Sequence, residues 1–455
     1  MSRAKYLAGA LLAASVAAAA ATYIGSEGPF RPQRQAPTVR SSALPSSGAA
    51  TLAQAPGRPQ LAELDRLIRS FSEQTRRSPS AAGFSFLGQL ELERARLTGD
   101  VDSYARAERA LEEAVTLAPE DAEPRALLAG VRFTTHDFAG ALALATEIYA
   151  SDRNVGALAV RGDAALELGR YEQAAGDYQV LAGVLPDAST TLVRMSRLSF
   201  LQGDASEAAR LAAEAEGAAE REGSFGASGS WYAAYRSRLA LEAGRYDDAV
   251  RHARRAVEAA PDYHVAVAGL ASARAAQGRI DDAIRLYERA VAMVPEPGSL
   301  AALGDLYFLT GDRRTASDRY ATVEAIATLQ AVNRQLYDRQ LALFWADHDG
   351  NLDEALSIAE RGLRIRRDVY GYDLLGWVLY RSGRFQEARD ASDRALAMDT
   401  PDARLWFHAG MISAALGDEE RARDELSRSL SLHPNFDPLL APLAAETLAG
   451  LGGPA

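Results

Sequence analysis

The sequence predicts an all-α fold, a right-handed α-solenoid of about ten stacked helical hairpins, and three observations lead to it. Small-residue turns recur about every 34 residues, an alanine follows each turn by a few positions, and aromatic residues make up only 7% of the chain. A fixed period of this length indicates one pair of helices copied end to end. The turns are centred on Gly99, Gly169, Gly203, Gly244, Gly278, Gly311, Gly350, Gly383 and Gly417, with His136 and Asp137 at the one position that lacks a glycine.

Each repeat is expected to hold two helices, as the unit that contains Tyr372 illustrates. Tyr372, Leu375 and Gly376 lie at i, i+3 and i+4 and therefore share one face of a helix. Gly383 ends that helix, because glycine adopts the left-handed backbone without steric cost. Ala388 lies on the second helix. We expect Gly376 and Ala388 to meet where the two helices cross, since larger side chains would hold the axes apart.

The repeats resemble the tetratricopeptide repeat, whose pattern is W-x2-L-G-x2-Y, then A-x3-F, then P. The matching segments are Tyr372-x2-Leu375-Gly376-x2-Leu379, Leu303-Gly304-Asp305-Leu306-Tyr307 and Trp406-x2-Ala409-Gly410. The alanines of the second helices are Ala141, Ala174, Ala208, Ala249, Ala283, Ala316, Ala355, Ala388 and Ala422. The closing prolines are Pro119, Pro186, Pro261, Pro295, Pro401 and Pro434. The resemblance covers residues 84–436 and implies that the first helix of each hairpin lines a concave surface.

Two longer spacings interrupt the period. The segment 221–231 contains Gly223, Gly226 and Gly229, which predicts a flexible loop between repeats. The segment 325–340 lacks Gly and Pro, which predicts longer helices instead. The first hairpin has extra residues before its turn, so we expect its first helix to be longer than those of the other repeats.

The repeats are expected to lie between two caps, because the terminal repeats of a solenoid need a polar outer face. An amphipathic helix within residues 61–83 is expected to cap the first hairpin, and a helix within 437–455 is expected to close the last one. Residues 25–60 are rich in Pro, Ser, Gln and Ala. Such a segment buries too little apolar surface to order itself, which predicts a disordered tether.

Residues 1–24 predict an export signal or a membrane anchor. Arg3 and Lys5 precede an uncharged stretch, 6–24, that is long enough to span a bilayer. Nearly half of it is alanine, which is far less favourable in lipid than leucine, and Ala-x-Ala sequences near its end suit cleavage. Both interpretations place the repeats outside the cytoplasm of a bacterial cell, in the periplasm or on an outer face, secreted or associated with the membrane through 6–24.

Composition argues against several other classes of protein. The net charge is −11 and no basic stripe is evident, which disfavours nucleic acid as a partner. The absence of cysteine excludes disulfides, thiolate metal sites and a lipid-modified N-terminal cysteine. No nucleotide-binding, zinc-protease or serine-hydrolase motif occurs in a usable context, so we expect no catalytic residue, metal or cofactor. The polar residues from Trp345 to Asp349 are typical of a helix end and the turn after it, where Asp and His are common. The alternative interpretation is a metal-binding or acid–base role.

The concave groove is the predicted binding surface, and aromatic residues concentrate in its C-terminal half. Aromatic side chains and arginine are typical of binding hot spots, whereas the alternative is that they pack between neighbouring repeats. The residues predicted to line the groove are Arg238, Phe308, Tyr337, Phe344, Tyr370, Trp377, Tyr380 and Phe407. Repeats of this family that clamp the C-terminal carboxylate of heat-shock chaperones use lysine and asparagine at inner positions. Here those positions hold residues such as Asp163 and Arg197, which disfavours that partner.

The sequence therefore predicts a non-enzymatic protein–protein interaction scaffold, exported or membrane-tethered, that binds a peptide or partner protein in its concave groove. Assembly of a cell-envelope complex is one setting for such a scaffold. Two alternatives stay open at this point. In the first, the chain is an accessory subunit of an envelope enzyme or transport system. In the second, residues 1–24 are not a targeting segment and the chain is a cytoplasmic regulator built from the same repeats.

Overall fold

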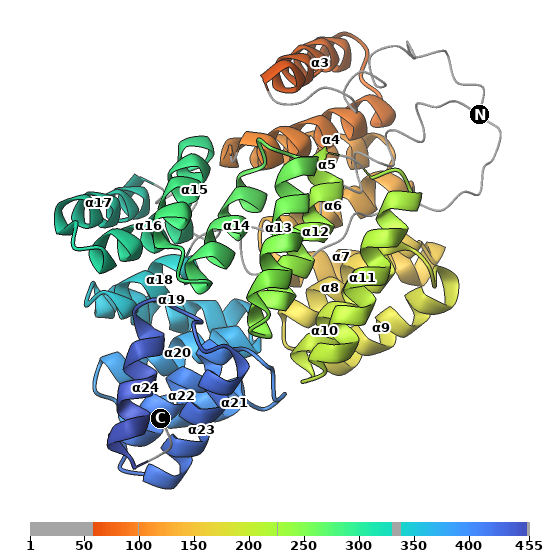
Figure 1. Cartoon of the computed structure of the whole chain (residues 1–455). Coiled ribbons are helices and arrows are strands. Elements are labelled where there is room, and N and C mark those ends of the chain that lie inside the picture. The colour runs from red at the N-terminus through yellow and green to blue at the C-terminus, as the bar shows by residue number, and fades with distance from the viewer. Residues whose placement is uncertain (1–57, 99, 225, 330–337, 453–455) are drawn as a thin grey trace.

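The chain forms a row of helical hairpins in the computed structural model, which describes residues 58–98, 100–224, 226–329 and 338–452 (Figure 1). These residues form twenty-two helices, α3 to α24, and no strand, so the predicted all-α fold is confirmed. The first helices of the hairpins are α4 (Ala81–Thr98), α6 (Ala122–Thr134), α8 (Val155–Glu167), α10 (Ser189–Leu201), α12 (Gly226–Glu242), α14 (His264–Ala276), α16 (Pro297–Leu309), α18 (Asp338–Asp347), α20 (Val369–Arg381) and α22 (Ala403–Ala415). The second helices are α5 (Val101–Leu117), α7 (Phe138–Asp152), α9 (Tyr171–Val184), α11 (Ala205–Arg221), α13 (Tyr246–Ala259), α15 (Ile280–Met293), α17 (Arg313–Leu329), α19 (Leu352–Ile365), α21 (Phe385–Ala395) and α23 (Glu419–Leu432). Helix α3 (Arg58–Arg77) precedes the hairpins and α24 (Leu440–Gly450) follows them.

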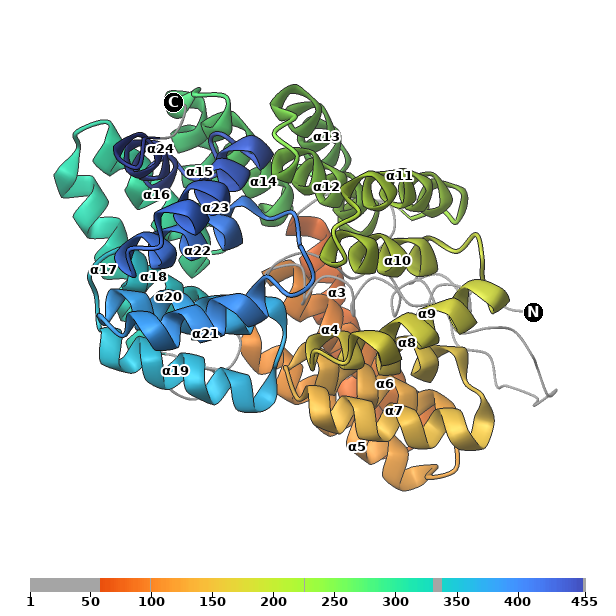
Figure 2. The same ribbon diagram turned by 90° about the horizontal axis from the view of Figure 1, so that it is seen from below.

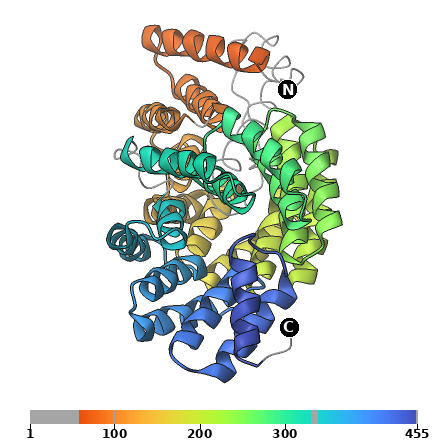
Figure 3. The ribbon, with the colours of Figure 1, turned by 60° about the vertical axis from the view of Figure 1, so that its left-hand side comes forward.

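Neighbouring helices stack in the order of the sequence. From α3 to α17 and from α18 to α24, each helix packs against the helices before and after it. Several first helices of successive hairpins also pack on one another, as α12 does on α14 and α20 on α22. Figures 1 and 3 show this row of hairpins following a curved path from α4 to α24. The arrangement is a solenoid, in which each hairpin buries its apolar face against its neighbours.

The turns inside the hairpins have the backbone that their residues predict. Gly383 has a φ of +74° and Gly417 a φ of +77°, in the left-handed region where a side chain would clash. His136, at the position without a glycine, adopts a φ of +64°. After Gly417, the Asp418 side chain accepts a hydrogen bond from the Arg421 N–H (3.2 Å) and caps α23.

Small residues lie at the helix crossings, as expected. A Cβ added at Gly376 would come within 3.2 Å of the Ala388 carbonyl oxygen, so α20 and α21 approach each other through their backbones. In the next hairpin Gly410 lies against Leu426 in the same way. The prediction for Gly376 and Ala388 is confirmed, and a larger side chain at either position would push the two helices apart.

The predicted flexible loop at 221–231 is wrong. Helix α11 continues to Arg221 and α12 begins at Gly226, so most of this glycine-rich segment belongs to helices. A Cβ at Gly229 would lie 2.6 Å from the Ser224 carbonyl oxygen, so the glycine allows the first turn of α12 to pack closely against the preceding chain. Glycine therefore serves a close approach here, and the sequence pattern alone does not distinguish that from flexibility.

The predictions of helix length have separate outcomes. Helix α4 has 18 residues against 13 in α6, so the longer first helix of the first hairpin is confirmed. Helix α17 has 17 residues and ends at Leu329. The remainder of the segment 325–340 lies mostly outside the described residues, as do the predicted signal or anchor at 1–24 and most of the tether at 25–60.

The solenoid turns back on itself and closes along a line that we call the seam. There the turns 169–171, 201–204 and 244–246 meet the segments 366–369, 399–402 and 433–435, which follow hairpins α18–α19, α20–α21 and α22–α23. The Tyr171 hydroxyl accepts a hydrogen bond from the Val369 N–H (3.0 Å), and Thr400 Oγ1 donates to the Leu201 carbonyl (2.7 Å). Figure 2 shows the cyan-to-blue half of the chain reaching across to the yellow and green half.

The last contact of the seam ties one segment to two hairpins. The Asn435 N–H donates to the Tyr246 hydroxyl (3.1 Å), and Asn435 Nδ2 donates to the Ala276 carbonyl (2.9 Å). The Tyr246 hydroxyl also lies 3.3 Å from His433 Nδ1. Asn435 is 189 and 159 residues away from these two partners in sequence, so the contacts come from the superhelical path and not from the stacking of neighbours.

Candidate functional site: the inner aromatic residues and an arginine-lined outer pocket

The predicted aromatic groove is largely closed by the packing of the chain itself. Phe407 is 0% exposed, Trp377 is 2% exposed and Phe344 is 6% exposed, and all three belong to the core of the C-terminal hairpins. Tyr380 is half-buried against the same core. These residues therefore do not form an open binding surface, which corrects the expectation for Trp377, Phe344 and Phe407 and agrees with the alternative that they pack between repeats.

Trp377 shows how completely the inner aromatic residues are engaged. Its ring stacks on Tyr380 with 4.9 Å between centroids and on His408 with 4.2 Å, and it touches Phe407 at 5.6 Å. Its indole Nε1 donates a hydrogen bond to Asp347 (2.8 Å). A tryptophan with its ring faces and its polar atom all occupied contributes to folding stability, so its truncation would remove core packing.

The other predicted groove residues are dispersed. Phe308, on α16, is 40% exposed and lies under the Arg313 guanidinium, 4.5 Å from its ring centroid. Arg238, on α12, is half-buried over the rings of Phe200 (5.5 Å) and Tyr235 (5.2 Å). Tyr370 is half-buried near the start of α20, and Tyr337 lies outside the described residues. The structure therefore does not bring the seven described residues of this set together as one accessible surface.

Charged side chains form ion pairs across the seam and beside it. Glu167, at the end of α8, pairs with Arg197 of α10 and with Arg366, which comes from the segment before α20. Arg366 also pairs with Asp368 (3.1 Å), and Asp368 pairs with Arg339 (2.7 Å). Burial opposes the charge of Glu167, but Arg197 and Arg366 outweigh it and hold the pKa of that carboxyl below its ordinary value. The ion pairs therefore join hairpins that are distant in sequence.

Two buried carboxyl groups at the seam, those of Glu242 and Asp402, disfavour each other's negative charge. Burial raises the pKa of the Glu242 carboxyl to about 8, and the charge of Asp402 raises it in the same direction. Burial and the neighbouring Asp373 also raise the pKa of Asp402. Arg238 and Arg404 oppose both shifts without cancelling them. Two acids that disfavour each other's charge thus face each other between α12 and the segment before α22.

The polar cluster from Trp345 to Asp349 has structural contacts. Trp345 Nε1 donates to Glu324 (2.6 Å), and His348 Nε2 lies 2.7 Å from Asp305. Burial acts to lower the pKa of His348, but the hydrogen bond and charge of Asp305 outweigh it and raise that pKa. Across the described part of the chain, no group of three or more His, Asp or Glu side chains is arranged to hold a metal ion.

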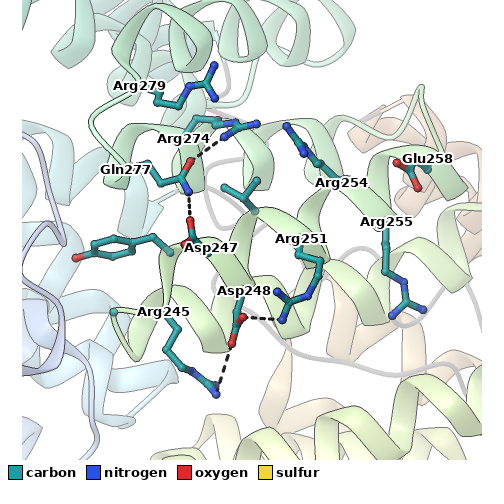
Figure 4. Close-up of a pocket in the computed structure, with 13 residues that line it drawn as sticks. Arg245, Asp247, Asp248, Arg251, Arg254, Arg255, Glu258, Arg274, Gln277 and Arg279 are labelled. Carbon is teal, nitrogen blue, oxygen red and sulfur yellow. Dashed lines mark hydrogen bonds and ion pairs between the residues drawn. The ribbon is translucent and has the colours of Figure 1, made fainter.

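A pocket of about 1200 Å³ lies on the outer side of α13 and the end of α14 (Figure 4). Six arginines and three acids line it, which gives a surplus of three positive charges on a chain whose net charge is −11. The lining residues that carry charge are Arg245, Asp247, Asp248, Arg251, Arg254, Arg255, Glu258, Arg274 and Arg279. The net charge of the chain gives no indication of this local surplus.

Most of these arginines are neutralised by nearby carboxylates. Asp248 pairs with Arg251 (2.6 Å) and more loosely with Arg245 (3.9 Å). Arg255 pairs with Glu216 (3.2 Å) and with a second glutamate of α11. Arg279 pairs with Asp282 of α15. Exposed pairs of this kind contribute little to stability, but they fix the directions of the side chains around the pocket.

Arg254 and Arg274 are different. Within the described residues no ion pair is formed by either guanidinium. Arg274 is 8% exposed, and its Nη1 donates to the neutral Gln277 Oε1 (2.8 Å), whose amide in turn donates to Asp247 (2.7 Å). Burial lowers the pKa of Arg274, and the charges of Arg254 and Arg279 lower it further. A cation of such low exposure without a paired carboxylate is unusual in a folded protein.

The sequence contains a weak signal for this surface. Arg251, Arg254, Arg255 and Glu258 recur at helical spacing on α13, with Arg274 on the next helix and Arg279 in the turn after it. Runs of charge on a helix usually mark a solvated face, so this pattern alone does not indicate a site. The burial of Arg274 is the missing information, and it depends on how α14 packs behind α13.

Comparisons with known proteins confirm the repeats. One tetratricopeptide repeat model matches residues 240–306, and another matches residues 132–191 and 374–435. The chain thus contains tetratricopeptide repeats, as the motif resemblance predicted. No curated protein matches the sequence.

Solved structures with a similar course of the chain are distant in sequence. The human IFIT1 dimer with PPP-AAAA is 14% identical, with 84% of this chain and 99% of that chain covered and a TM-score of 0.44. The thermophilic tetratricopeptide protein TTC0263 of Thermus thermophilus is 21% identical, with 42% and 98% covered and a TM-score of 0.37. The Cut9–Hcn1 hetero-tetramer of the APC/C is 14% identical, with 89% and 98% covered and a TM-score of 0.33. Similarity at this level carries no functional argument.

Proposed function

We propose that this chain is a non-enzymatic scaffold, exported or membrane-tethered, that binds a partner protein on the open outer surface of its solenoid. The observation that supports the proposal is the row of tetratricopeptide repeats, because stacked hairpins present a large rigid surface to a partner. The outer surface is favoured over the inner one because Trp377, Phe344 and Phe407 are already packed in the core. Assembly of a complex in the cell envelope remains the setting we propose.

The proposed export depends on the sequence. Arg3, Lys5 and the apolar stretch 6–24 have the pattern of a signal or anchor, and residues 25–60 would then separate the solenoid from the membrane. Among the helices that the structure describes, none is long and apolar enough to cross a bilayer. Protease treatment of intact spheroplasts tests this part: we expect digestion of the solenoid, and protection until lysis would contradict export.

Cross-linking tests the partner surface in the full chain. A photo-reactive amino acid is placed at exposed apolar positions on the second helices of separate hairpins, Leu117, Val180 and Ile365, and at the buried Phe407 as a control. We expect a discrete adduct with a second protein from at least one exposed position in the organism that encodes the chain, and none from Phe407. Absence of adducts from every exposed position, with the protein folded and present at normal level, would contradict the scaffold function.

A further inference from the structure

We propose that the outer pocket binds an acidic segment of a partner protein, with one of its carboxylates between Arg254 and Arg274. The inference rests on the proposed scaffold function and specifies the chemistry of the segment that the scaffold binds. It concerns the outer helix α13 and the end of α14, away from the inner positions where the chaperone-clamping repeats hold a carboxylate.

The guanidinium of Arg274 has little exposure and, among the described residues, no carboxylate partner. A guanidinium removed from water loses favourable hydration, and a protein normally restores it with a carboxylate. Arg274 is more than nine-tenths buried, yet its Nη1 donates a hydrogen bond to the neutral amide of Gln277. The charges of Asp282 and Asp247 oppose the lowering of its pKa, but Asp282 pairs with Arg279 and Asp247 accepts a hydrogen bond from Gln277. The side chain therefore has unused donors and an unfavourable environment.

Arg254 places a second guanidinium close to that of Arg274. Its exposed side chain projects from α13, and Figure 4 shows the Arg254 and Arg274 guanidiniums pointing toward one another across the pocket. Two like charges held together repel, which accords with the effect of Arg254 on the Arg274 pKa. A carboxylate has two oxygens that each accept charge-assisted hydrogen bonds from a guanidinium. One acidic side chain between them would replace a repulsion with two attractions.

The remaining lining favours a protein segment over a nucleic acid. Asp247, Asp248 and Glu258 are interspersed with the arginines, and they would repel a continuous line of phosphates. Tyr246 and Val250 add apolar contact area beside the charged groups. The whole chain is acidic, which further disfavours a polyanion of uniform charge. Isolated carboxylates separated by neutral residues fit this pattern better.

Binding of a defined peptide tests the proposal on the purified full chain. The probe is a fluorescein-labelled Glu-Ser repeat peptide, and the comparison is the same peptide with every Glu replaced by Gln. Fluorescence anisotropy should show saturable binding of the Glu peptide only. Arg254→Gln should weaken it about tenfold or more, since a charge-assisted hydrogen bond is lost.

Two matched variants separate a specific site from diffuse attraction. Arg255→Gln removes the same charge from the next residue of α13, but that arginine is already paired with Glu216 and should change affinity by less than about threefold. Arg274→Met should abolish peptide binding and at the same time raise the Tm by roughly 2–4 °C, because it removes an uncompensated buried cation. A residue with a purely structural role would lower the Tm instead.

Three results would overturn the inference: equal losses in Arg254→Gln and Arg255→Gln, no difference between the Glu and Gln peptides, or tighter Arg254-dependent binding of single-stranded RNA than of the Glu peptide. The same experiments distinguish failure of this inference from failure of the proposed scaffold function. If Arg254→Gln leaves the cross-linked partner unchanged in cells and no acidic peptide binds, the scaffold stands and this pocket is not its site. If no exposed position gives an adduct while the acidic peptide binds as expected, the pocket stands and the scaffold function falls.

Discussion

The turns at the seam and the turns elsewhere in the solenoid have the same backbone but different surroundings. Gly169 has a φ of +72° and Gly383 a φ of +74°, and each ends the first helix of its hairpin. A Cβ on Gly169 would overlap the Arg367 carbonyl oxygen, whereas a Cβ on Gly383 would meet nothing within 4 Å. Gly417 resembles Gly383 in this respect. One sequence signal therefore serves two purposes, a helix end at every turn and a close chain contact at the seam.

The difference shows how the solenoid differs from a simple stack. A stack of hairpins is stabilised by contacts between neighbours and tolerates local change. Contacts such as Thr400 to Leu201, 199 residues apart, add a second set of interactions that form only when the whole path is in place. The seam turns should consequently be more sensitive to substitution than the open turns, and this expectation can be measured.

The largest expected effect is the contrast between Gly169→Ala and Gly383→Ala. Alanine in the left-handed region costs about 1–2 kcal/mol, and Gly383→Ala should lower the free energy of unfolding by that amount alone. Gly169→Ala should cost about 2 kcal/mol more, because the added methyl group displaces Arg367 and opens the seam. Urea denaturation of both variants measures the difference, and equal losses would mean that the seam contributes nothing at this turn.

A smaller effect is expected at Thr400. Its hydroxyl is fully buried and donates across the seam to the Leu201 carbonyl (2.7 Å), so Thr400→Val leaves that carbonyl without its donor. We expect a loss of about 1–2 kcal/mol in the free energy of unfolding. Thr447→Val is the matched control, since the Thr447 hydroxyl donates to the Leu443 carbonyl within its own helix, α24, and not across the seam. A loss at Thr447 as large as that at Thr400 would contradict the comparison.

The last expected effect is a pH dependence of stability at Glu242. Its pKa is raised from 4.5 to about 8 in the folded protein, so the folded state keeps a proton that the unfolded state releases. Stability from this group is therefore present below pH 4.5 and is lost as the pH rises through 8. Glu242→Gln should be more stable than the parent at pH 8, and the gain should shrink as the pH falls and vanish toward pH 4.5. A gain that does not depend on pH would contradict the raised pKa.

The fold could be predicted from the sequence to the extent that its rules are local. Turn glycines, crossing residues such as Gly376 and the extra length of α4 follow from spacing and steric size, and the structure has them. The segment 221–231 was mispredicted because glycine is used both for flexibility and for close approach. The seam could not be predicted, because it depends on the accumulated curvature of many hairpins and no single repeat encodes it.

The candidate site was predictable only in part. The helical faces of Trp377 and Phe407 could be identified, but their burial depends on the neighbouring repeats, which the periodicity does not specify. The arginine pocket could not be predicted from the overall composition. A net charge of −11 averages over the chain and conceals a local surplus, and only packing shows that Arg274 is buried without a carboxylate.

Closure of the solenoid is the central claim, and an engineered disulfide tests it most directly. A Cβ on Gly203 would lie 3.7 Å from the Cβ of Asp399, which is the separation found in disulfides, and the natural chain has no cysteine to interfere. Under mild oxidation, the double variant Gly203→Cys, Asp399→Cys should form an intramolecular disulfide, seen as a faster band on non-reducing gels. The control pair Gly417→Cys, Asp399→Cys should stay reduced. Failure of the first pair to cross-link in folded monomer, or equal cross-linking of both pairs, would contradict a closed superhelix.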